Sequence, residues 1–251
     1  MNKHNKILNL ILPIITISCI LIVWTFGAIL VDSEYLLPSI KLTLKEFFRL
    51  FLDGRFYTAF AFTLLRSFIA FLFSFLLASL LAFLSSKSKT AEGLILPFIS
   101  VVRALPTLAI ILLLIFWTNE QIAPIVVTAL VVMPTTYTHV KSALELIDKT
   151  SVEAGRVDGA TKKESFLKIE LPQIAPAIYS AIGGGLSLNL KLMVAAEVMS
   201  ATVRSLGTML NISNYNDQTA KMLALVLVVL IIGLLIEFFF NFLSKKTGNW
   251  R

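Results

Sequence analysis

Long apolar runs, each of a length suited to crossing a lipid bilayer, dominate the pattern along this chain. A helix that crosses the hydrocarbon core needs about 20 mainly apolar residues, because each residue adds about 1.5 Å of length. Runs of this kind occupy residues 7–31, 57–84, 94–117, 122–139, 174–201 and 220–243. The fourth is the shortest and contains Pro124 and Pro134, which membrane helices tolerate when neighbouring groups satisfy the freed carbonyls. The pattern predicts an all-α integral membrane protein with six transmembrane helices.

The segment between the first two runs, residues 35–56, has a different pattern. Its apolar side chains fall on one helical face: Ile40, Leu44, Phe47, Phe48 and Phe51. Its basic side chains recur every four residues on another face: Lys41, Lys45 and Arg49. Such two-faced helices typically lie in the membrane interface, and we expect an interfacial helix here.

Composition supports a membrane protein and narrows the chemistry. Hydrophobic residues make up 57% of the 251 residues and charged residues 15%, against about 45–50% and about 25% in soluble domains. In a membrane protein the excess of Lys and Arg sets the orientation in the bilayer. We therefore attribute the net charge of +7 to orientation and expect no nucleic-acid partner. One cysteine, Cys19, excludes a disulfide within the chain, and only two histidines, His4 and His139, are available for a metal.

Charge asymmetry gives an orientation. With a cytoplasmic N-terminus, the inner segments hold roughly twice as many Lys and Arg residues as the outer segments, which predicts that both termini are cytoplasmic. The first run is too long for the core of a cleaved signal peptide and is expected to remain as a spanning helix. The longest inner segment is then the loop 141–172, which carries six basic and six acidic residues.

That loop contains signals for two short helices. Thr150-Ser-Val-Glu153 and Thr161-Lys-Lys-Glu164 both match the capping box, in which a Thr and a Glu three residues later satisfy each other's backbone N–H groups. Gly159 lies between them and suits a turn with positive φ. We therefore expect an ordered helix–turn–helix excursion that contacts a partner.

The same loop carries the residues that resemble a known family. Glu153-Ala154-Gly155, three residues, Gly159, nine residues and Ile169-Glu-Leu171-Pro172 resemble the EAA signature of ABC importer permeases. The signature reads Glu-Ala-Ala, three residues, Gly, nine residues, Ile, any residue, Leu-Pro, so the only departure is Gly155. In that family this loop docks on a separate ATP-binding subunit. The apolar Phe166 and Leu167 on a charged segment are suited to anchor such a contact.

The resemblance extends from about Ala59 to Leu243. The expected transmembrane domain is therefore 57–243, which leaves an N-terminal helix and interfacial segment at 1–56 and a cytoplasmic tail at 244–251. The stretches 97–106 and 191–197, the latter followed by Ser205-Leu-Gly207, resemble motifs of the nitrate, sulfonate, taurine and thiamine-precursor group. Membership implies a permease in the cytoplasmic (inner) membrane that moves a small anionic or polar solute inward.

The resemblance also implies partners: an ATP-binding subunit, an extracytoplasmic solute-binding protein and a second copy of this chain. The chain has no Gly-rich phosphate loop followed by Lys-Ser/Thr, so we expect it to bind no cofactor and have no catalytic site, with ATP used by the partner subunit. A secondary transporter would show an internal repeat of spans, and a membrane enzyme would need an acid–base, nucleophilic or metal constellation; neither feature is evident.

Four charged residues within the predicted spans are candidates for the solute path: Arg66, Arg103, Lys191 and Glu197; Glu237 also lies within a span but is the least suited to a functional role. Charges at membrane depth normally face the bundle interior or a polar cavity. They could line a path for an anionic solute such as a sulfonate or nitrate, or a vitamin precursor. They could instead pair internally, for instance Lys191 or Arg103 with Glu197. Two interpretations of the glycine triplet Gly183-Gly-Gly185 also remain open. It could form a flexible section of the path, or a surface on which another helix packs closely.

Overall fold

The structure, a computed structural model, describes the backbone of residues 3–248 and the side chains of residues 11–248. The basic side chains of Lys3, Lys6 and Arg251, which contribute to the predicted orientation, lie outside this described part. The chain divides into two compact units, a first unit of residues 1–57 and 209–228 and a second unit of residues 58–208 and 229–251. Each unit is described by itself.

The regular elements of the described chain are all helical, as predicted. In order they are α1 (Lys3–Val31), α2 (Ile40–Leu50), α3 (Gly54–Lys87), α4 (Lys89–Ala104), α5 (Thr107–Trp117), α6 (Ala123–Glu145), α7 (Lys149–Val157), α8 (Lys162–Ser165), a π-helical turn (Phe166–Glu170), α9 (Leu171–Ser200), α10 (Leu206–Tyr215) and α11 (Thr219–Gly248). By length and composition, five helical segments of the described chain qualify as membrane spans, and α4 with α5 supply a sixth if the bent pair counts as one. All six predicted spans are therefore recovered as apolar helices.

The third span differs from its prediction because it is broken. The run 94–117 was expected to be one helix, but α4 and α5 meet at an angle of 91°. Leu105 has an extended ψ of 130° and Pro106 follows it with a ψ of 110°. A proline has no N–H to donate to the helix and its ring disfavours helical geometry at the preceding residue, so the helix ends there and restarts at Thr107.

In the first unit, the amphipathic segment forms α2, which is shorter than the predicted range 35–56. The hydroxyl of Ser39 accepts a hydrogen bond from the N–H of Leu42 and so caps the helix. The indole N–H of Trp24 on α1 donates to the carbonyl of Pro38 at 3.1 Å. This bond fixes the turn between α1 and α2, so the local path of the chain is set by side chains next to the turn.

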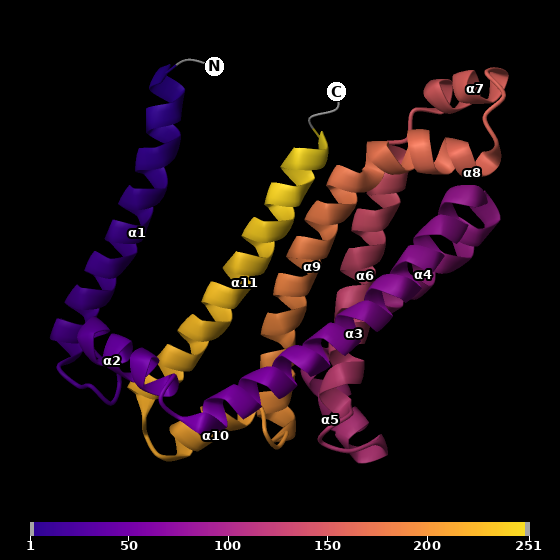
Figure 1. Cartoon of the computed structure of the whole chain (residues 1–251). Coiled ribbons are helices and arrows are strands. Elements are labelled where there is room, and N and C mark those ends of the chain that lie inside the picture. Colours follow the sequence, from indigo (N-terminus) through magenta and orange to yellow (C-terminus); the bar gives the residue numbers. More distant parts are fainter. Residues whose placement is uncertain (1–2, 249–251) are drawn as a thin grey trace. The chain divides into compact units, whose positions relative to one another are not determined.

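In the second unit, α6 packs along α9, and the C-terminal half of α11 runs beside α9 (Figure 1). Small side chains let α3 approach closely: Ala78 and Ala82 are fully buried against Met133 and Tyr137 of α6. The Tyr137 hydroxyl donates to Ser85 at 2.9 Å. The core of this unit therefore combines close helix contacts with buried polar side chains such as Asn189, whose amide donates to Ser67 on α3, as expected where packing and interhelical hydrogen bonds drive association.

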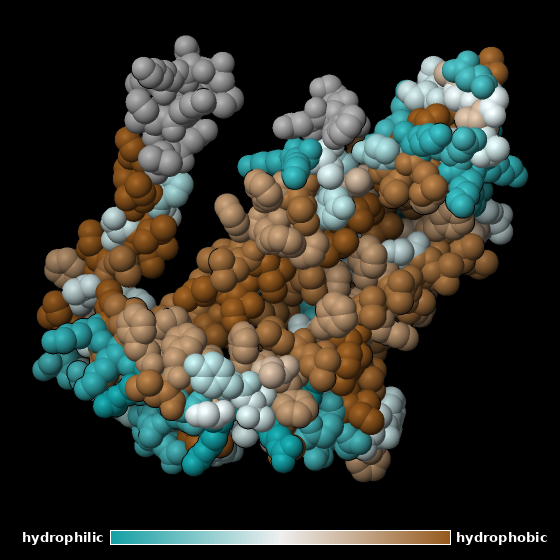
Figure 2. Space-filling view, in the orientation of Figure 1, coloured by the Kyte–Doolittle hydropathy of each residue, from teal (hydrophilic) through white to brown (hydrophobic). Residues whose placement is uncertain are grey.

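The surface of the second unit is apolar along its helices and hydrophilic around α7 and α8 (Figure 2). Large apolar side chains on α3 and α11 are exposed, among them Phe73 (64%) and Phe238 (73%). A soluble monomer rarely shows apolar surface of this extent, so these faces are suited to lipid or to another protein within the membrane.

Candidate functional site

The helix–turn–helix excursion begins at Asp148. Its carboxylate accepts hydrogen bonds from the N–H groups of Thr150 (3.0 Å) and Ser151 (3.2 Å) and one from the Ser151 hydroxyl. The Ser151 hydroxyl and the Thr150 N–H hold the pKa of Asp148 below its usual value, so the cap stays ionised at neutral pH. The prediction that Thr150 and Glu153 start this helix is wrong, because Asp148 supplies the cap and α7 begins at Lys149. The excursion also starts later than residue 141, because α6 continues to Glu145.

The second helix follows its prediction. The Thr161 hydroxyl accepts from the Glu164 N–H at 3.3 Å, and the Glu164 carboxylate accepts from the Thr161 N–H at 3.0 Å. Gly159 between the helices has a φ of +86°, a conformation that glycine adopts without a steric penalty. The capping box and the glycine turn are both confirmed, and α8 continues through the π-helical turn into α9.

The two ends of the motif contact each other across the turn. A Cβ built on Gly155 would lie 2.3 Å from Cδ1 of Ile169. Glycine at this position therefore leaves room for the isoleucine side chain that packs α7 against the π-helical turn. The terminal Cδ1 of Ile169 is the atom that would have to move if alanine stood at this position.

Several apolar side chains of the excursion project outward. Phe166 and Leu167 are 45% and 47% exposed, and Val157, the last residue of α7, is 87% exposed. Val157 was not singled out from the sequence, although an apolar residue directly before Asp158-Gly159 could have marked it as the tip of the turn. Of the other motif residues, Glu153, Ala154, Leu171 and Pro172 are exposed, while Gly155 and Ile169 are half-buried.

A buried charge pair lies at the other end of α9, away from the excursion. Glu197 is fully buried and its carboxylate is 3.1 Å from Nη1 of Arg66 on α3. The Thr63 hydroxyl donates to Glu197 at 2.8 Å. Nη2 of Arg66 donates to the side chain of Gln121 at 2.7 Å and to the carbonyl of Val203 at 3.1 Å. These bonds tie α3, the α5–α6 connection and the turn after α9 together.

The four predicted intramembrane charges do not form one site. Arg66 and Glu197 pair with each other, so the suggested pairing of Glu197 with Lys191 or Arg103 does not occur. Lys191 lies 3.9 Å from Glu237 on α11, and both side chains are partly exposed. Arg103 donates to the hydroxyl of Thr138 at 3.0 Å. Only Lys191 and Arg103 are therefore placed where a solute could reach them, while Arg66 is held by protein oxygens.

The glycine triplet packs between helices. A Cβ on Gly183 would lie 2.6 Å from Cβ of Phe240 on α11, and a Cβ on Gly185 would lie 2.8 Å from the ring of Phe71 on α3. The packing alternative therefore accounts for both residues. Among the residues that the structure describes, no group of three His, Cys, Asp or Glu side chains is placed to hold a metal ion.

The helical bundle of apolar spans, with a hydrophilic helix–turn–helix excursion before its penultimate span, has the architecture expected of a transport permease. The chain belongs to the family described as binding-protein-dependent transport system inner membrane component, whose profile matches residues 74–249. It is therefore a multi-pass inner-membrane protein and the permease subunit of an ABC importer.

Individual relatives fit this family. The chain is 24% identical to the taurine transport system permease protein TauC of Escherichia coli, over 96% of this chain and 90% of the relative. It is 26% identical to the Bacillus subtilis permease SsuC, whose name refers to aliphatic sulfonates transport, over 99% of this chain and 89% of the relative. A chain of the MetNI methionine ABC transporter shares the fold, with a TM-score of 0.62, 20% identity and coverage of 75% of this chain and 94% of that chain.

Proposed function

We propose that the α7–α8 excursion is the docking element for a separate ATP-binding subunit, and that ATP hydrolysis there drives inward movement of a small anionic or polar solute. One observation carries the proposal: a charged, hydrophilic segment that matches the EAA spacing holds Val157, Phe166 and Leu167 with large exposed fractions. Apolar side chains that project from a polar segment are typical anchors for a partner's pocket.

The continuous helix behind the excursion supports a route for the coupling. Residues Lys162–Ser200 form one helical segment of 39 residues through α8, the π-helical turn and α9. The N–H of Asp148 donates to the side chain of Gln173 at 2.7 Å, which ties the start of α7 to α9. Lys141 on α6 pairs with Glu92 on α4. A displacement of the docked excursion would therefore be carried into α9 and on to Lys191 and Glu197.

The same proposal orients the chain and sets its partners. The excursion and both termini lie in the cytoplasm, as the distribution of basic residues indicates. An extracytoplasmic binding protein delivers the solute, which the family description supports. Two copies of the chain form the path with two ATP-binding subunits, because a single bundle of six spans offers little room for one. The names of the taurine and sulfonate relatives support an anionic solute.

The experiment is co-purification of the ATP-binding subunit with variants of the excursion, with the permease level in the membrane measured alongside. Val157→Ala and Phe166→Ala should each weaken the association, because loss of a buried anchor typically costs about 2 kcal/mol, or about thirty-fold in affinity. Gly159→Val should also uncouple the subunits, because a β-branched residue opposes the positive φ.

Gly159→Asn is the matched control. Among the described residues, apart from its two chain neighbours, no atom lies within 4 Å of the position that a Cβ on Gly159 would occupy, so the two variants differ mainly in backbone preference. Asparagine accepts a left-handed conformation far better than valine, and Gly159→Asn should keep the ATP-binding subunit. If Val157→Ala, Phe166→Ala and Gly159→Val all retain wild-type association, the excursion is not the docking element.

A further inference from the structure

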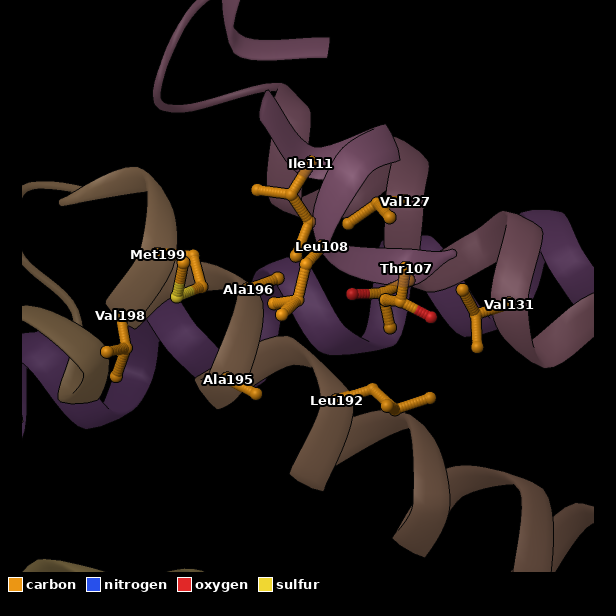
Figure 3. A pocket seen from close by; sticks show the side chains of 11 residues that line it. Thr107, Leu108, Ile111, Val127, Val131, Leu192, Ala195, Ala196, Val198 and Met199 are labelled. Atoms are coloured by element: carbon orange, nitrogen blue, oxygen red, sulfur yellow. The ribbon is translucent and has the colours of Figure 1, made fainter. Parts of the chain in front are cut away.

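The second unit contains an apolar cavity of about 260 Å³ between α5, α6 and α9 (Figure 3). Side chains of α9 form one wall, and those of α5 and α6 face them: Leu192, Ala195, Ala196, Val198 and Met199 opposite Thr107, Leu108, Ile111, Val127, Thr128 and Val131. Sites for drug-sized molecules are larger, about 300–1,000 Å³. The occupant that this cavity fits is a small group, such as a short alkyl chain.

One polar group in the wall of this cavity lacks a partner. Thr128 is 1% exposed, and its hydroxyl has no hydrogen-bond partner within the described residues. On the same helix, the buried hydroxyl of Thr136 donates to the carbonyl of Val132 at 3.0 Å. Buried hydroxyl groups in proteins are almost always bonded. The Thr128 hydroxyl has almost no accessible surface, however, so an occupant of the cavity contacts the apolar lining and does not reach this group.

A positive charge lies on the edge of the same face of α9. Successive residues of a helix are rotated by about 100° and displaced by about 1.5 Å, so Lys191 lies about 40° from Ala195 around the axis and about 6 Å from it along the axis. Lys191, Ala195 and Met199 are all exposed. A lysine in the middle of a span is disfavoured against lipid, so this face is suited to water, solute or protein.

The ammonium group of Lys191 remains accessible to a ligand. Its nearest acidic partner, Glu237 on α11, is 3.9 Å away, and the two side chains are 53% and 38% exposed. This distance is too long for a hydrogen bond, so the contact is a loose ion pair that an anion could displace. The carboxylate of Glu197 is committed to Arg66 and Thr63.

We infer that Lys191 and this cavity form a binding site for a small amphipathic anion within the translocation path. The anionic head group pairs with the ammonium of Lys191, and the short apolar chain lies against Ala195 and Met199. This inference rests on the proposed function and specifies the chemistry of its solute: a charged oxygen head with an apolar part of a few carbon atoms.

Cysteine protection tests the inference directly, because Cys19 is the only native cysteine. In a Cys19→Ser background, Ala195→Cys or, from the opposite wall, Val131→Cys places one thiol in the cavity. The full permease with its ATP-binding subunit is reconstituted in lipid nanodiscs and labelled with N-ethylmaleimide. At about ten times its dissociation constant, 1-butanesulfonate should slow labelling about tenfold, because only about a tenth of the sites remain free. Methanesulfonate and 1-butanol at the same concentration should protect much less.

Two substitutions then separate the contributions of the head-group and cavity contacts. Lys191→Gln should abolish protection by 1-butanesulfonate, and Met199→Ala, which removes part of the apolar wall, should weaken it. Thr128→Val is the control, because its hydroxyl is sealed from the cavity, and protection should be unchanged. Retained co-purification of the ATP-binding subunit shows that a loss of protection concerns this site and not the docking element.

The inference is overturned if 1-butanesulfonate and 1-butanol protect equally, or if neither protects at both cysteine positions. It is also overturned if Lys191→Gln leaves protection unchanged. Formation of a disulfide between two copies through Ala195→Cys, at a rate unaffected by the sulfonate, would assign this face to contact with a second copy.

Discussion

Substitution of Glu197 by glutamine probes the buried charge pair with a minimal change of shape. The carboxylate is fully buried and 3.1 Å from Nη1 of Arg66, whose side chain is only 10% exposed. Glutamine keeps the volume and one acceptor oxygen but removes the negative charge. The variant therefore leaves the positive charge of Arg66 buried without its counter-ion.

The size of the effect follows from the groups that remain around Arg66. Removal of one partner from a buried ion pair typically costs about 3–5 kcal/mol. Arg66 keeps its bonds to the Gln121 side chain at 2.7 Å and the Val203 carbonyl at 3.1 Å, and these neutral acceptors reduce the loss. We therefore expect the free energy of unfolding to fall by about 3 kcal/mol, the lower end of that range.

Reversible unfolding in mixed micelles, followed by circular dichroism, measures this loss. Glu237→Gln is the control, because it makes the same chemical change in a pair that is 3.9 Å apart and partly exposed, where about 0–1 kcal/mol is expected. The double variant Arg66→Met, Glu197→Leu should recover part of the stability, because it leaves no unpaired charge. Equal losses for Glu197→Gln and Glu237→Gln would refute the reasoning.

Three further predictions concern coupling, transport and assembly. Gly155→Ala should leave co-purification of the ATP-binding subunit unchanged, because its Cβ meets only the terminal Cδ1 of Ile169, which can rotate away; Gly155→Leu, whose side chain needs the space of the whole isoleucine, should weaken it, and equal losses for the two variants would contradict this expectation. Lys191→Ala should lower solute uptake by proteoliposomes while permease level and ATP-binding subunit stay constant, and wild-type uptake would leave Lys191 a packing residue. Native mass spectrometry should find two identical permease chains with two ATP-binding subunits, and one permease or two different ones would contradict the homodimer.

Apolar length was sufficient to predict the spans but not the shape of the third. All six runs became helices because lipid leaves the backbone few alternatives to internal hydrogen bonding. The break at Leu105-Pro106 has a local cause that is visible in the sequence, since proline disfavours a helical conformation at the residue before it. Pro134 lies in a similar run and α6 continues through it. A proline alone therefore does not tell which span is broken.

The excursion was largely predictable because its determinants are local. The capping box at Thr161 and the turn at Gly159 involve residues within a few positions of each other, and both are present. The start of α7 was misassigned because Asp148 and Thr150 both suit an N-cap and lie two residues apart. The carboxylate of Asp148 can accept two N–H groups at once, and only the folded geometry shows that it does.

The buried charge pair shows where sequence reasoning ends. The sequence gives the depth of each charge along its span. Lys191 and Glu197 are six residues apart, which corresponds to about 9 Å along the axis of one helix, and this separation disfavours a direct ion pair between them. Arg66 and Glu197 are 131 residues apart, and no periodic pattern states that their helices meet. Whether two charges at similar depth face each other depends on the rotation of each helix about its axis. That rotation is set by close contacts such as those of Gly185 with Phe71, so the partner of a buried charge is decided by apolar packing elsewhere on the same helices.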